Sequence, residues 1–492
     1  MLHTIVQTFN FFIIFYVIGM QIQILVVATM SYRALASDRF VTRHGRIQDM
    51  ITSDTTPPIS IVIPAYNEAA GIADSVRSMA MLHYPNMEII VVNDGSNDDT
   101  VQRMIEAFDM VPIDFPFRNA IPTQKIERLY KSRLPHPVVL VDKENGGKSD
   151  AINAGINVSK YPYFMATDAD MVLESEALIH AARHFVEDRE RTVAVGGNVR
   201  PLNGCEVRLG KVTKVSLPRT AIEMAQVVEY IRSFLSARPG WSRMGSLLIV
   251  SGAFGIFSKA AVTEVGGFRN DHLGEDMEMT MRLHRHFRRK KQDYRIVYSA
   301  DAVAWTEVPV TWNVLKKQRV RWHRGLIQVI WQYRGMIFNP RYGFVGMVAW
   351  PSFIAFEFIA PVLEFTGWIL VPISLLTGFL NPEVALPLVL IALLLGTANS
   401  IASLYLDDRF GYYSDGRSTL RLLMYTLGEH LGLRQRSVWW RVRSLFWNPK
   451  KKVWGDMQRT GVGNLGSKTS PPPSPLASVP PASSVLGPSG DS

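Results

Sequence analysis

Apolar segments of two different lengths alternate with polar sequence along this chain. Four short ones are each followed by a polar turn and then a helix-like segment: ISIVIPA, MEIIVVND, PVVLVDK and YFMA. Short apolar runs without alternation are typical of strands that are buried on both faces. Because these strands alternate with helices, the pattern predicts an α/β domain with a mainly parallel sheet over residues 50–310.

The longer apolar segments predict membrane helices. Residues 1–32 contain no Lys, Arg, Asp or Glu, and they lack the basic start and cleavage site of a signal peptide. We therefore expect a retained N-terminal transmembrane helix. Residues 342–433 are expected to hold about four more: two before residue 380 that turn near Pro361, one over 384–406 and one over 420–433. The last is short and carries charges, so an interfacial segment is the alternative.

The charge distribution orients these helices. Lys and Arg number 53 against 43 Asp and Glu, a net charge of +10, and the excess lies beside the apolar segments, for example at Arg33, Arg39 and Arg434. Basic flanks face the cytoplasm, which predicts a multi-pass protein of the inner (plasma) membrane with a cytoplasmic middle domain. Proximity to anionic lipid accounts for the basic excess, so no nucleic-acid partner is expected.

Two further features of composition agree with this organisation. Cys205 is the single cysteine, which precludes an intramolecular disulfide and fits a reducing, cytosolic location. Residues 466–492 are rich in Pro and Ser and are predicted to be disordered, because such a sequence cannot bury a core.

Polar turns at the strand ends supply the first candidate site residues. In parallel α/β sheets, ligands bind beyond the carboxyl ends of the strands. Five candidates lie there: Asn67, Glu68, Asp94, Lys148 and Asp168. Taken singly, each has an ordinary explanation, since Asp-Gly-Ser is common turn chemistry and a lysine can be solvent-exposed. Their shared position at the strand ends favours a function.

Asp168 and Asp170 stand one residue apart at the end of the YFMA strand. They could cap a following helix. Two carboxylates are more than a cap needs, however, and their repulsion is relieved if a cation lies between them. Oxygen ligands of this kind suit Mg²⁺ or Mn²⁺.

Three later segments extend the candidate site. Gly252 lies among small residues, which permit a ligand to approach the backbone closely. Glu275 and Asp276 stand at a predicted helix start. Their negative charge there could simply interact favourably with the helix dipole, or one of the two carboxylates could serve as a general base.

The third segment is a helix expected over 311–333, in which Gln318, Arg321 and Trp322 share one face. An apolar stripe that includes Trp322 also predicts that this helix lies on the membrane surface. Both interpretations can hold for one helix.

Seven motifs now stand in order: PAYNE, NDGS, NGGKSDAIN, DAD, SGAFG, GED and QRVRW. With membrane segments outside them, they resemble the processive, membrane-integrated family 2 glycosyltransferases. These include synthases of poly-N-acetylglucosamine, chitin oligosaccharides, hyaluronan and cellulose. The resemblance covers residues 60–455. It implies a GT-A (Rossmann-like) fold and an inverting transfer from a UDP-sugar, which extends a β-linked polysaccharide and passes it across the membrane.

The resemblance also implies a role for each candidate. For the donor, Asp94 would bind the uridine and Lys148 the diphosphate, Asn67, Glu68 and Asp168 would lie near the nucleotide, Asp170 would hold the metal, and Gln318 and Arg321 would stabilise the leaving diphosphate. For the acceptor, Asp276 would be the general base, with Glu275, Gly252 and Trp322 beside the sugar.

Several alternatives stay open at this stage. UDP-GlcNAc is the favoured donor, and UDP-glucose would make the product a β-glucan. Transfer of a single sugar to a lipid carrier suits the membrane segments equally well. A transporter or sensor is a third class, because Glu357 and Glu364 could share a helix face inside the membrane. Expected partners are the UDP-sugar, the growing polysaccharide and the bilayer, and accessory export subunits are left open.

Overall fold

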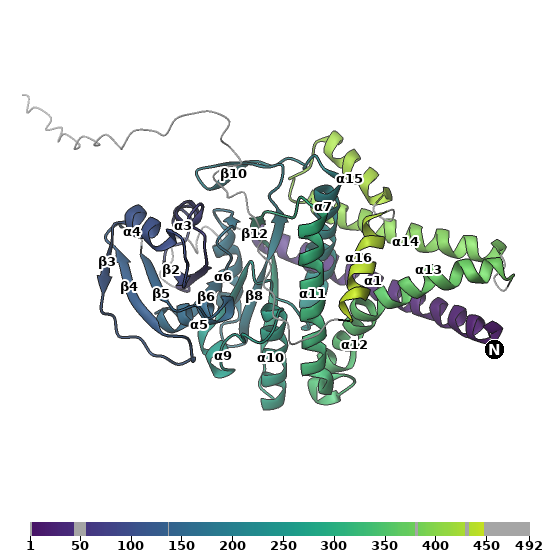
Figure 1. Ribbon diagram of the computed structural model, residues 1–492, viewed down its shortest axis with the longest axis horizontal. Coiled ribbons are helices and arrows are strands. Elements are labelled where there is room, and N and C mark those ends of the chain that lie inside the picture. Colours follow the sequence, from purple (N-terminus) through teal and green to yellow (C-terminus); the bar gives the residue numbers. More distant parts are fainter. Residues whose placement is uncertain (1, 44–55, 136, 379–381, 429–431, 447–492) are drawn as a thin grey trace, which may run out of the picture.

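The computed structural model describes residues 2–43, 56–135, 137–378, 382–428 and 432–446. The Pro/Ser-rich tail over 466–492 and residues 50–55 of the predicted domain lie outside these described residues. The described part divides visibly into a sheet-based portion and a bundle of helices that projects from it (Figure 1).

A ten-stranded sheet in the order β3-β4-β5-β2-β1-β6-β11-β8-β12-β7 organises the first portion. The strands are β1 (Ile59–Ala65), β2 (Met87–Asp94), β3 (Met110–Ile113), β4 (Ile126–Ser132), β5 (Val138–Lys143), β6 (Tyr163–Ala166), β7 (Val172–Leu173), β8 (Thr192–Pro201), β11 (Gly255–Ser258) and β12 (Arg295–Thr306). A separate hairpin joins β9 (Glu206–Arg208) to β10 (Lys211–Lys214).

The four strands predicted from the apolar runs form the parallel centre β5-β2-β1-β6. This confirms the α/β class. The expectation of a mainly parallel sheet is corrected to a mixed one, because β11 runs antiparallel between β6 and β8, and β4 runs antiparallel to β5. The short strands β3, β4 and β11 do not carry a long apolar run that would have predicted them.

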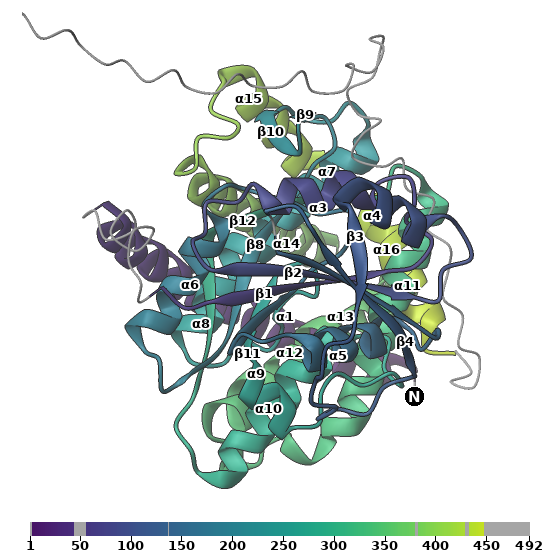
Figure 2. The same cartoon turned by 90° about the vertical axis from the view of Figure 1, so that its left-hand side faces the viewer.

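Helices cover both faces of the sheet, with α3 and α4 over one face and α5 over the other (Figure 2). The helices before residue 334 are α1 (Leu2–Arg43), α3 (Ile72–Ala80), α4 (Thr100–Phe108), α5 (Lys148–Val158), α6 (Ala177–Glu187), α7 (Ala221–Ile231), α8 (Arg238–Arg243), α9 (Lys259–Glu264), α10 (Glu275–Lys290) and α11 (Trp312–Tyr333). A π-helical turn, η1 (Arg232–Ala237), lies between α7 and α8. This two-sided arrangement places the strand ends and helix starts at one edge, where ligands of such folds bind.

The apolar region after α11 differs from the prediction. Instead of two helices that turn near Pro361, one continuous helical run extends through Val345–Leu376. It consists of η4 (Val345–Ala349), α12 (Trp350–Phe353), η5 (Ile354–Ile359) and α13 (Ala360–Leu376). The π turns η4 and η5 each end two residues before a proline, Pro351 and Pro361. A wider turn there accommodates the missing N–H and the ring, so proline does not end the helix.

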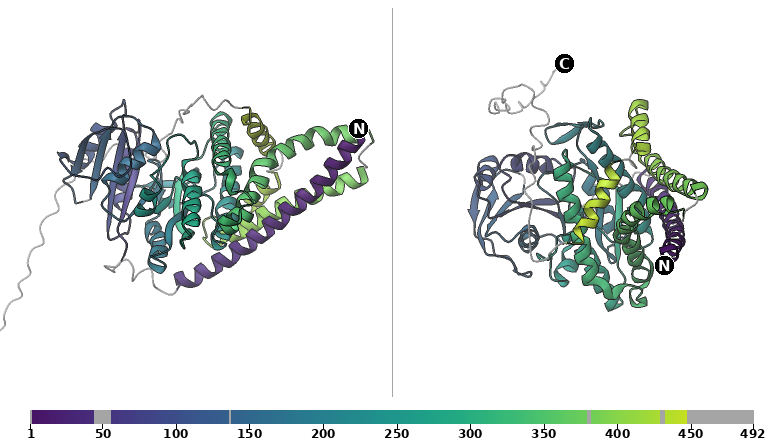
Figure 3. Two further views of the ribbon diagram at one scale, coloured as in Figure 1. Left: turned by 90° about the horizontal axis from the view of Figure 1, so that it is seen from below. Right: turned by 45° about the vertical axis from the view of Figure 1, so that its right-hand side comes forward.

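Among the residues that the structure describes, two helices are long and apolar enough to cross a membrane, Phe11–Asp38 and Val345–Leu376. Only 6% and 11% of their most apolar windows are buried, so neither is a core helix of the sheet domain. α14 (Pro382–Asp408) follows, and α1, α13 and α14 run side by side away from the sheet (Figure 3). Near the predicted fourth helix over 420–433, α15 spans Gly416–Gly428 and so begins four residues earlier, while residues 429–431 lie outside the described part of the chain.

The glutamates of the long helical run are paired with arginines of α16 (Leu433–Ser444). Glu364 accepts hydrogen bonds from Arg434 at 3.0 Å, and Glu357 lies 3.7 Å from Arg441. The two carboxylates therefore each face a cation on another helix.

The contact between α5 and the sheet centre gives a test of the packing. A Cβ atom on Gly155 would lie 2.3 Å from Cγ1 of Val62, which is closer than packed carbon atoms approach. Gly155→Ala gains about 1 kcal/mol of helix propensity but overpacks the core by about 1–3 kcal/mol. We expect net destabilisation of up to about 2 kcal/mol, measured by thermal unfolding in detergent.

Gly71→Ala is the matched control, because Gly71 has φ −130° and no atom lies within 4 Å of its added Cβ. Its stability should change by no more than about 0.5 kcal/mol. Equal effects of the two substitutions would contradict the packing described here.

Candidate active site

The turn after β1 is tied to the turn after β2. Asn67 has φ 56°, a left-handed conformation that asparagine tolerates. Its backbone N–H donates to Oγ of Ser96 at 2.9 Å, and its side-chain oxygen accepts from the N–H of Asn97 at 2.9 Å. Glu68 donates its backbone N–H to Oγ1 of Thr100 at 3.0 Å. These bonds fix the predicted strand-end loops against each other.

Asp94 organises the loop that precedes Lys148. Its carboxylate accepts hydrogen bonds from the backbone N–H groups of Gly146 at 2.9 Å and Gly147 at 2.7 Å. Its backbone carbonyl accepts from Nδ2 of Asn145 at 2.7 Å. Asp94 is buried, and both of its carboxylate oxygens are engaged in this way. The side chain predicted to bind the uridine therefore holds the start of α5 in place.

Lys143 was not singled out from the sequence. Its buried ammonium lies 2.6 Å from Asp94 and 2.7 Å from Asp150 of α5. Asp150 also accepts from the backbone N–H of Gln124 at 3.2 Å. A lysine at the end of the apolar run PVVLVDK was the available signal, because a buried lysine requires acidic partners.

Lys148 begins α5 and joins two segments that are far apart in the sequence. Its ammonium lies 2.6 Å from Oδ1 of Asp168 and 3.4 Å from Oε1 of Glu275. The three side chains are between 16% and 28% exposed, so the group stays open to a ligand. Burial disfavours the charged lysine, but Asp168 and Glu275 outweigh burial and raise the pKa of Lys148. Burial and the neighbouring Asp276 raise the pKa of Glu275, against the opposing effect of Lys148.

Gly252 and Asp276 complete this cluster. The backbone N–H of Gly252 lies 3.3 Å from Oδ2 of Asp276, and a Cβ on Gly252 would lie 3.7 Å from Nζ of Lys148. Asp276 also accepts from the N–H of Met277 at 2.7 Å, as expected at a helix start. The structure thus brings Lys148, Asp168, Gly252, Glu275 and Asp276 together, as predicted from widely separated motifs.

The helix that carries Gln318, Arg321 and Trp322 is held against this cluster. A Cβ on Gly325 of α11 would lie 2.8 Å from the backbone nitrogen of Gly274, immediately before Glu275. Oε1 of Gln328 accepts from the N–H of Leu273 at 2.8 Å. Glycine at position 325 therefore permits α11 to touch the start of α10, and the sequence analysis missed this role.

Arg321 and Trp322 lie one turn before that contact. Arg321 is close enough to Lys148 to oppose its positive charge. Trp322 is 43% exposed, and the guanidinium of Arg319 lies 4.6 Å from its ring centroid. Arg319 in turn forms a bidentate pair with Glu229 of α7, at 2.5 and 2.8 Å. The stacked guanidinium of Arg319 thereby holds the partly exposed ring of Trp322 in one orientation.

A divalent metal fits the residues at the end of β6. The part of the chain that the structure describes contains no group of three or more His, Cys, Asp or Glu side chains placed to hold a metal ion. Mg²⁺, however, commonly uses one or two carboxylates and completes its shell with substrate phosphates and water. Asp170 is half-buried and follows Asp168 by two residues, after the end of β6. The residues after it form β7 from Val172, and the expected helix begins only at Ala177.

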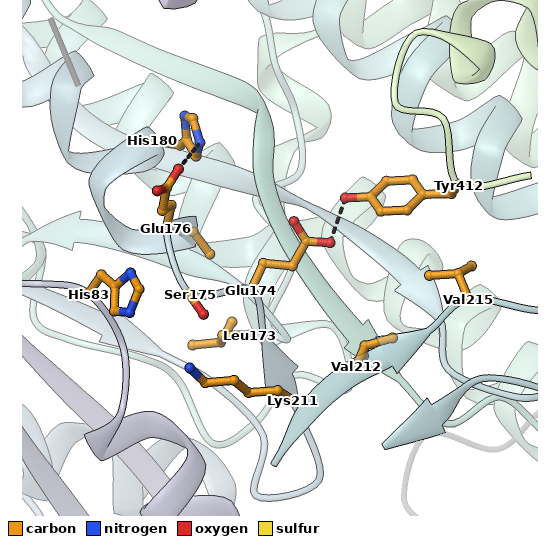
Figure 4. A pocket seen from close by; sticks show the side chains of 11 residues that line it. His83, Leu173, Glu174, Ser175, Glu176, His180, Lys211, Val212, Val215 and Tyr412 are labelled. Carbon is orange, nitrogen blue, oxygen red and sulfur yellow. Dashed lines mark hydrogen bonds and ion pairs between the residues drawn. The ribbon is translucent and has the colours of Figure 1, made fainter. Parts of the chain in front are cut away.

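A separate cavity of about 380 Å³ lies at the β7 edge of the sheet (Figure 4). Glu174 faces it and accepts hydrogen bonds from Nε1 of Trp305 at 3.1 Å and from the hydroxyl of Tyr412. None of the predicted site residues lines this cavity. It is therefore distinct from the cluster around Lys148.

The carboxylate cluster can serve two chemical purposes at once. Lys148 and Arg321 are cations that suit an anionic diphosphate, and Asp276 is a carboxylate within the same cluster that suits proton abstraction.

Comparison with known proteins agrees with this chemistry. The profile described as "Glycosyl transferase family 2" matches residues 60–118, and that described as "Glycosyl transferase family group 2" matches residues 163–398. The chain belongs to glycosyltransferase family 2.

Among curated relatives of this family 2 chain are two named poly-β-1,6-N-acetyl-D-glucosamine synthase. The Staphylococcus epidermidis protein is 32% identical over 273 residues, which is 55% of each chain. The protein of Staphylococcus aureus strain COL is 31% identical over 281 residues, or 57% of each chain. The chain thus matches these relatives over little more than half of their length.

Two solved structures show partial similarity to this chain. The mannosyltransferase PcManGT of Pyrobaculum calidifontis, in complex with GDP-Man and Mn²⁺, is 18% identical, with a TM-score of 0.48, and the match covers 77% of this chain and 96% of that one. S. aureus TarS in complex with UDP-GlcNAc is 16% identical, with a TM-score of 0.33 and coverage of 56% and 66%.

The Lys148 cluster predicts a pH-dependent loss of stability in one variant. Lys148→Met leaves Asp168 and Glu275 facing each other, so their pKa values in the folded state rise above those in the unfolded state. The folded state then binds more protons, and its stability falls as pH rises through the raised pKa values. We expect a deficit of about 1–3 kcal/mol at pH 8, and a smaller one at pH 5.

Lys214→Met is the matched control, because Lys214 pairs with Glu206 at 3.2 Å on the surface, where both side chains are more than half exposed. Thermal unfolding at both pH values measures the difference. A deficit for Lys148→Met that is equal at pH 5 and pH 8 would contradict the proposed repulsion.

Proposed function

We propose that this family 2 glycosyltransferase is an inverting, processive enzyme that extends a β-linked polysaccharide from a UDP-sugar. The observation that carries the proposal is the position of Lys148 between Asp168 and Glu275, with Asp276 in the same cluster. A diphosphate can exchange for one of these carboxylates as the partner of Lys148. The donor would then bind immediately beside the base.

In this proposal Asp276 takes the proton from the acceptor hydroxyl. Its Oδ2 faces the backbone N–H of Gly252, which holds the carboxylate in one orientation. The deprotonated oxygen attacks the anomeric carbon from the side opposite to the diphosphate, and the bond to the diphosphate breaks. One such displacement on an α-linked donor gives a β-glycosidic bond. Glu275 neighbours the base and limits the rotation of Lys148.

The leaving UDP gathers negative charge, which the surrounding cations stabilise. Lys148 and Arg321 approach this position from α5 and α11, and Gln318 lies one turn before Arg321. Asp94 acts through the Gly146-Gly147 backbone that it holds, while Asn67, Glu68 and Asp168 border the nucleotide. Preorganised charges of this kind usually contribute the largest part of the rate enhancement.

A divalent cation, Mg²⁺ or Mn²⁺, would be held by Asp170 together with the donor diphosphate. When bound, it would neutralise charge on the phosphate oxygens. The Mn²⁺ of the mannosyltransferase structure belongs to that protein and is consistent with divalent metal use in related folds.

Repeated addition is supported by α11. The exposed ring of Trp322 offers an apolar face on which an acceptor sugar can pack, and the pair of Arg319 and Glu229 fixes its orientation. α11 then leads through a shared core into the helical run Val345–Leu376. A polymer that leaves Trp322 would meet the membrane helices directly, which supports translocation.

UDP-GlcNAc is the proposed donor, because the curated relatives are named as synthases of an N-acetylglucosamine polymer. UDP-glucose, which would give a β-glucan, is the alternative. Transfer of one sugar to a lipid carrier remains a second candidate, and product length separates it from polymerisation.

The proposed location is the cytoplasmic membrane, with the catalytic domain in the cytoplasm. α1, the run Val345–Leu376 and α14 would cross the bilayer, and α15 would stay on the cytoplasmic side. Two crossings after α11 return the chain to the side on which it began. The arginines of α16 then face the cytoplasm, as the positive-inside rule requires.

Removal of the base tests the activity. Asp276→Asn should lower UDP release from UDP-GlcNAc by at least about 100-fold in detergent with Mg²⁺, because general base catalysis contributes 10²–10⁴-fold. Asp293→Asn is the control, since Asp293 is 77% exposed and pairs with surface Arg191. UDP release by Asp276→Asn at the control rate would refute the assignment. Release from UDP-glucose alone would move the product to a β-glucan.

Cysteine labelling tests the membrane crossings. In a Cys205→Ser background, Thr377→Cys after α13 and Ser414→Cys before α15 are both exposed positions. We expect a membrane-impermeant maleimide applied to intact cells to label the first and not the second. Five crossings with a turn near Pro361 would give the opposite result, because residue 377 would then be cytoplasmic and residue 414 external.

A further inference from the structure

A second charged cavity lies between the end of α10 and the start of the membrane run. It has a volume of about 190 Å³ and is lined by Arg285 and Arg289 of α10, by Arg341 of η3 (Pro340–Tyr342), and by Tyr333 and Tyr342. No predicted site residue lines it. The cavity is therefore separate from the catalytic cluster.

Three guanidinium groups face this cavity, and no carboxylate lines it. Arg285, Arg289 and Arg341 form no ion pair with any residue that the structure describes. Arg289 donates only to the hydroxyl of Tyr342 at 3.3 Å, and Arg285 lies 5.9 Å from the ring centroid of Tyr333. Like charges gathered around one cavity repel each other unless an anion is present.

The acid that contacts the lining residue Tyr333 is already engaged. Glu278 is fully buried and accepts from the hydroxyl of Tyr333 at 2.7 Å and from Arg282 at 2.8 Å. It cannot also neutralise the three arginines. Basic residues at the end of α10 interact favourably with the helix dipole. Arg341 belongs to another element, so the dipole of α10 does not explain its position at the cavity.

The surroundings point to the membrane surface. Phe338 and Phe344, each three residues from Arg341, are 68% and 40% exposed, and Trp331, next to the lining residue Gln332, is 64% exposed. The candidate membrane span begins immediately afterwards at Val345. Exposed aromatic rings beside arginines are typical of the interface between headgroups and water.

We propose that this cavity binds a phosphate group of an anionic ligand, supplied by an acidic phospholipid headgroup at the cytoplasmic surface. The guanidinium group of an arginine can donate two parallel hydrogen bonds to the oxygens of one phosphate. The volume is below the 300–1,000 Å³ typical of sites for drug-sized ligands, so it suits a phosphate ester rather than a nucleotide. Occupancy would tie α10, whose first turn carries Asp276, to the start of the membrane run.

The test is thermal unfolding of the full chain in detergent, followed by tryptophan fluorescence. Three probes are compared at equal concentration: short-chain phosphatidylglycerol, short-chain phosphatidylcholine and inorganic phosphate. We expect phosphatidylglycerol to raise the midpoint by about 2–4 °C, since a ligand that binds only the folded state stabilises it. Phosphatidylcholine should have no effect, because its phosphate is already balanced by choline.

The variant R285Q/R289Q/R341Q should lose this shift. The matched control is R103Q/R118Q/R133Q, which removes the same charge from three exposed arginines near β3 and β4, far from the cavity. Arg341→Gln alone alters an exposed side chain and should weaken the shift if the triple variant does not fold.

The two sources of phosphate give different results. A shift with phosphatidylglycerol and none with inorganic phosphate assigns the site to the lipid headgroup, whereas equal shifts assign it to free phosphate. The proposal is overturned if phosphatidylcholine protects as well as phosphatidylglycerol, if no probe shifts the wild type, or if both triple variants respond alike. The readout does not use catalysis, so it stands apart from the proposed glycosyl transfer.

Discussion

The site depends on the contacts that the ammonium group of Lys148 makes with two carboxylates. Asp168 at the end of β6 and Glu275 at the start of α10 would repel each other without a cation between them, and Lys148 lies within 2.6 and 3.4 Å of the two. This contact explains why the loop before Lys148 is so firmly held. Asp94 accepts from Gly146 and Gly147, and Lys143 fixes Asp94 in turn. A buried network of hydrogen bonds and ion pairs thus fixes the loop that positions Lys148.

The second constraint is the close contact between α10 and α11. Glycine at position 325 permits the two helices to touch, because a Cβ atom there would lie 2.8 Å from the backbone nitrogen of Gly274. A larger side chain at position 325 would separate α11, which carries Arg321 and Trp322, from the start of α10. One buried cluster then continues from Met277 and Met281 of α10, through Val329 and Tyr333 of α11, to Val345 and Trp350 of the membrane run. The helix whose first turn carries Asp276, the proposed base, therefore shares a core with the candidate membrane span Val345–Leu376. In the proposed function, this core would couple the chemistry to the place where a product leaves.

The sequence predicted the parallel centre of the sheet and the gathering of the motif residues, because apolar runs and polar strand ends are local signals. The mixed strands and the helical run through Pro361 were not predictable in this way. β11 takes its place from its neighbours β6 and β8, and Pro361 is tolerated because a π turn precedes it. Lys143 and Gly325 were missed since their roles arise only when distant segments meet. The role of Asp94 as an acceptor for the Gly146 and Gly147 backbone was not predicted, because it too arises only when two loops meet, and its contact with the uridine stays a prediction.

The size of the product made from UDP-GlcNAc tests the central claim most directly. The purified protein would be supplied with UDP-GlcNAc and Mg²⁺, and the products analysed by mass spectrometry at low donor conversion. The account predicts long β-linked N-acetylglucosamine chains while most acceptors are still unextended, as expected when Trp322 retains the growing chain. A product that carries one added sugar would contradict processive polymerisation and favour transfer to a lipid carrier.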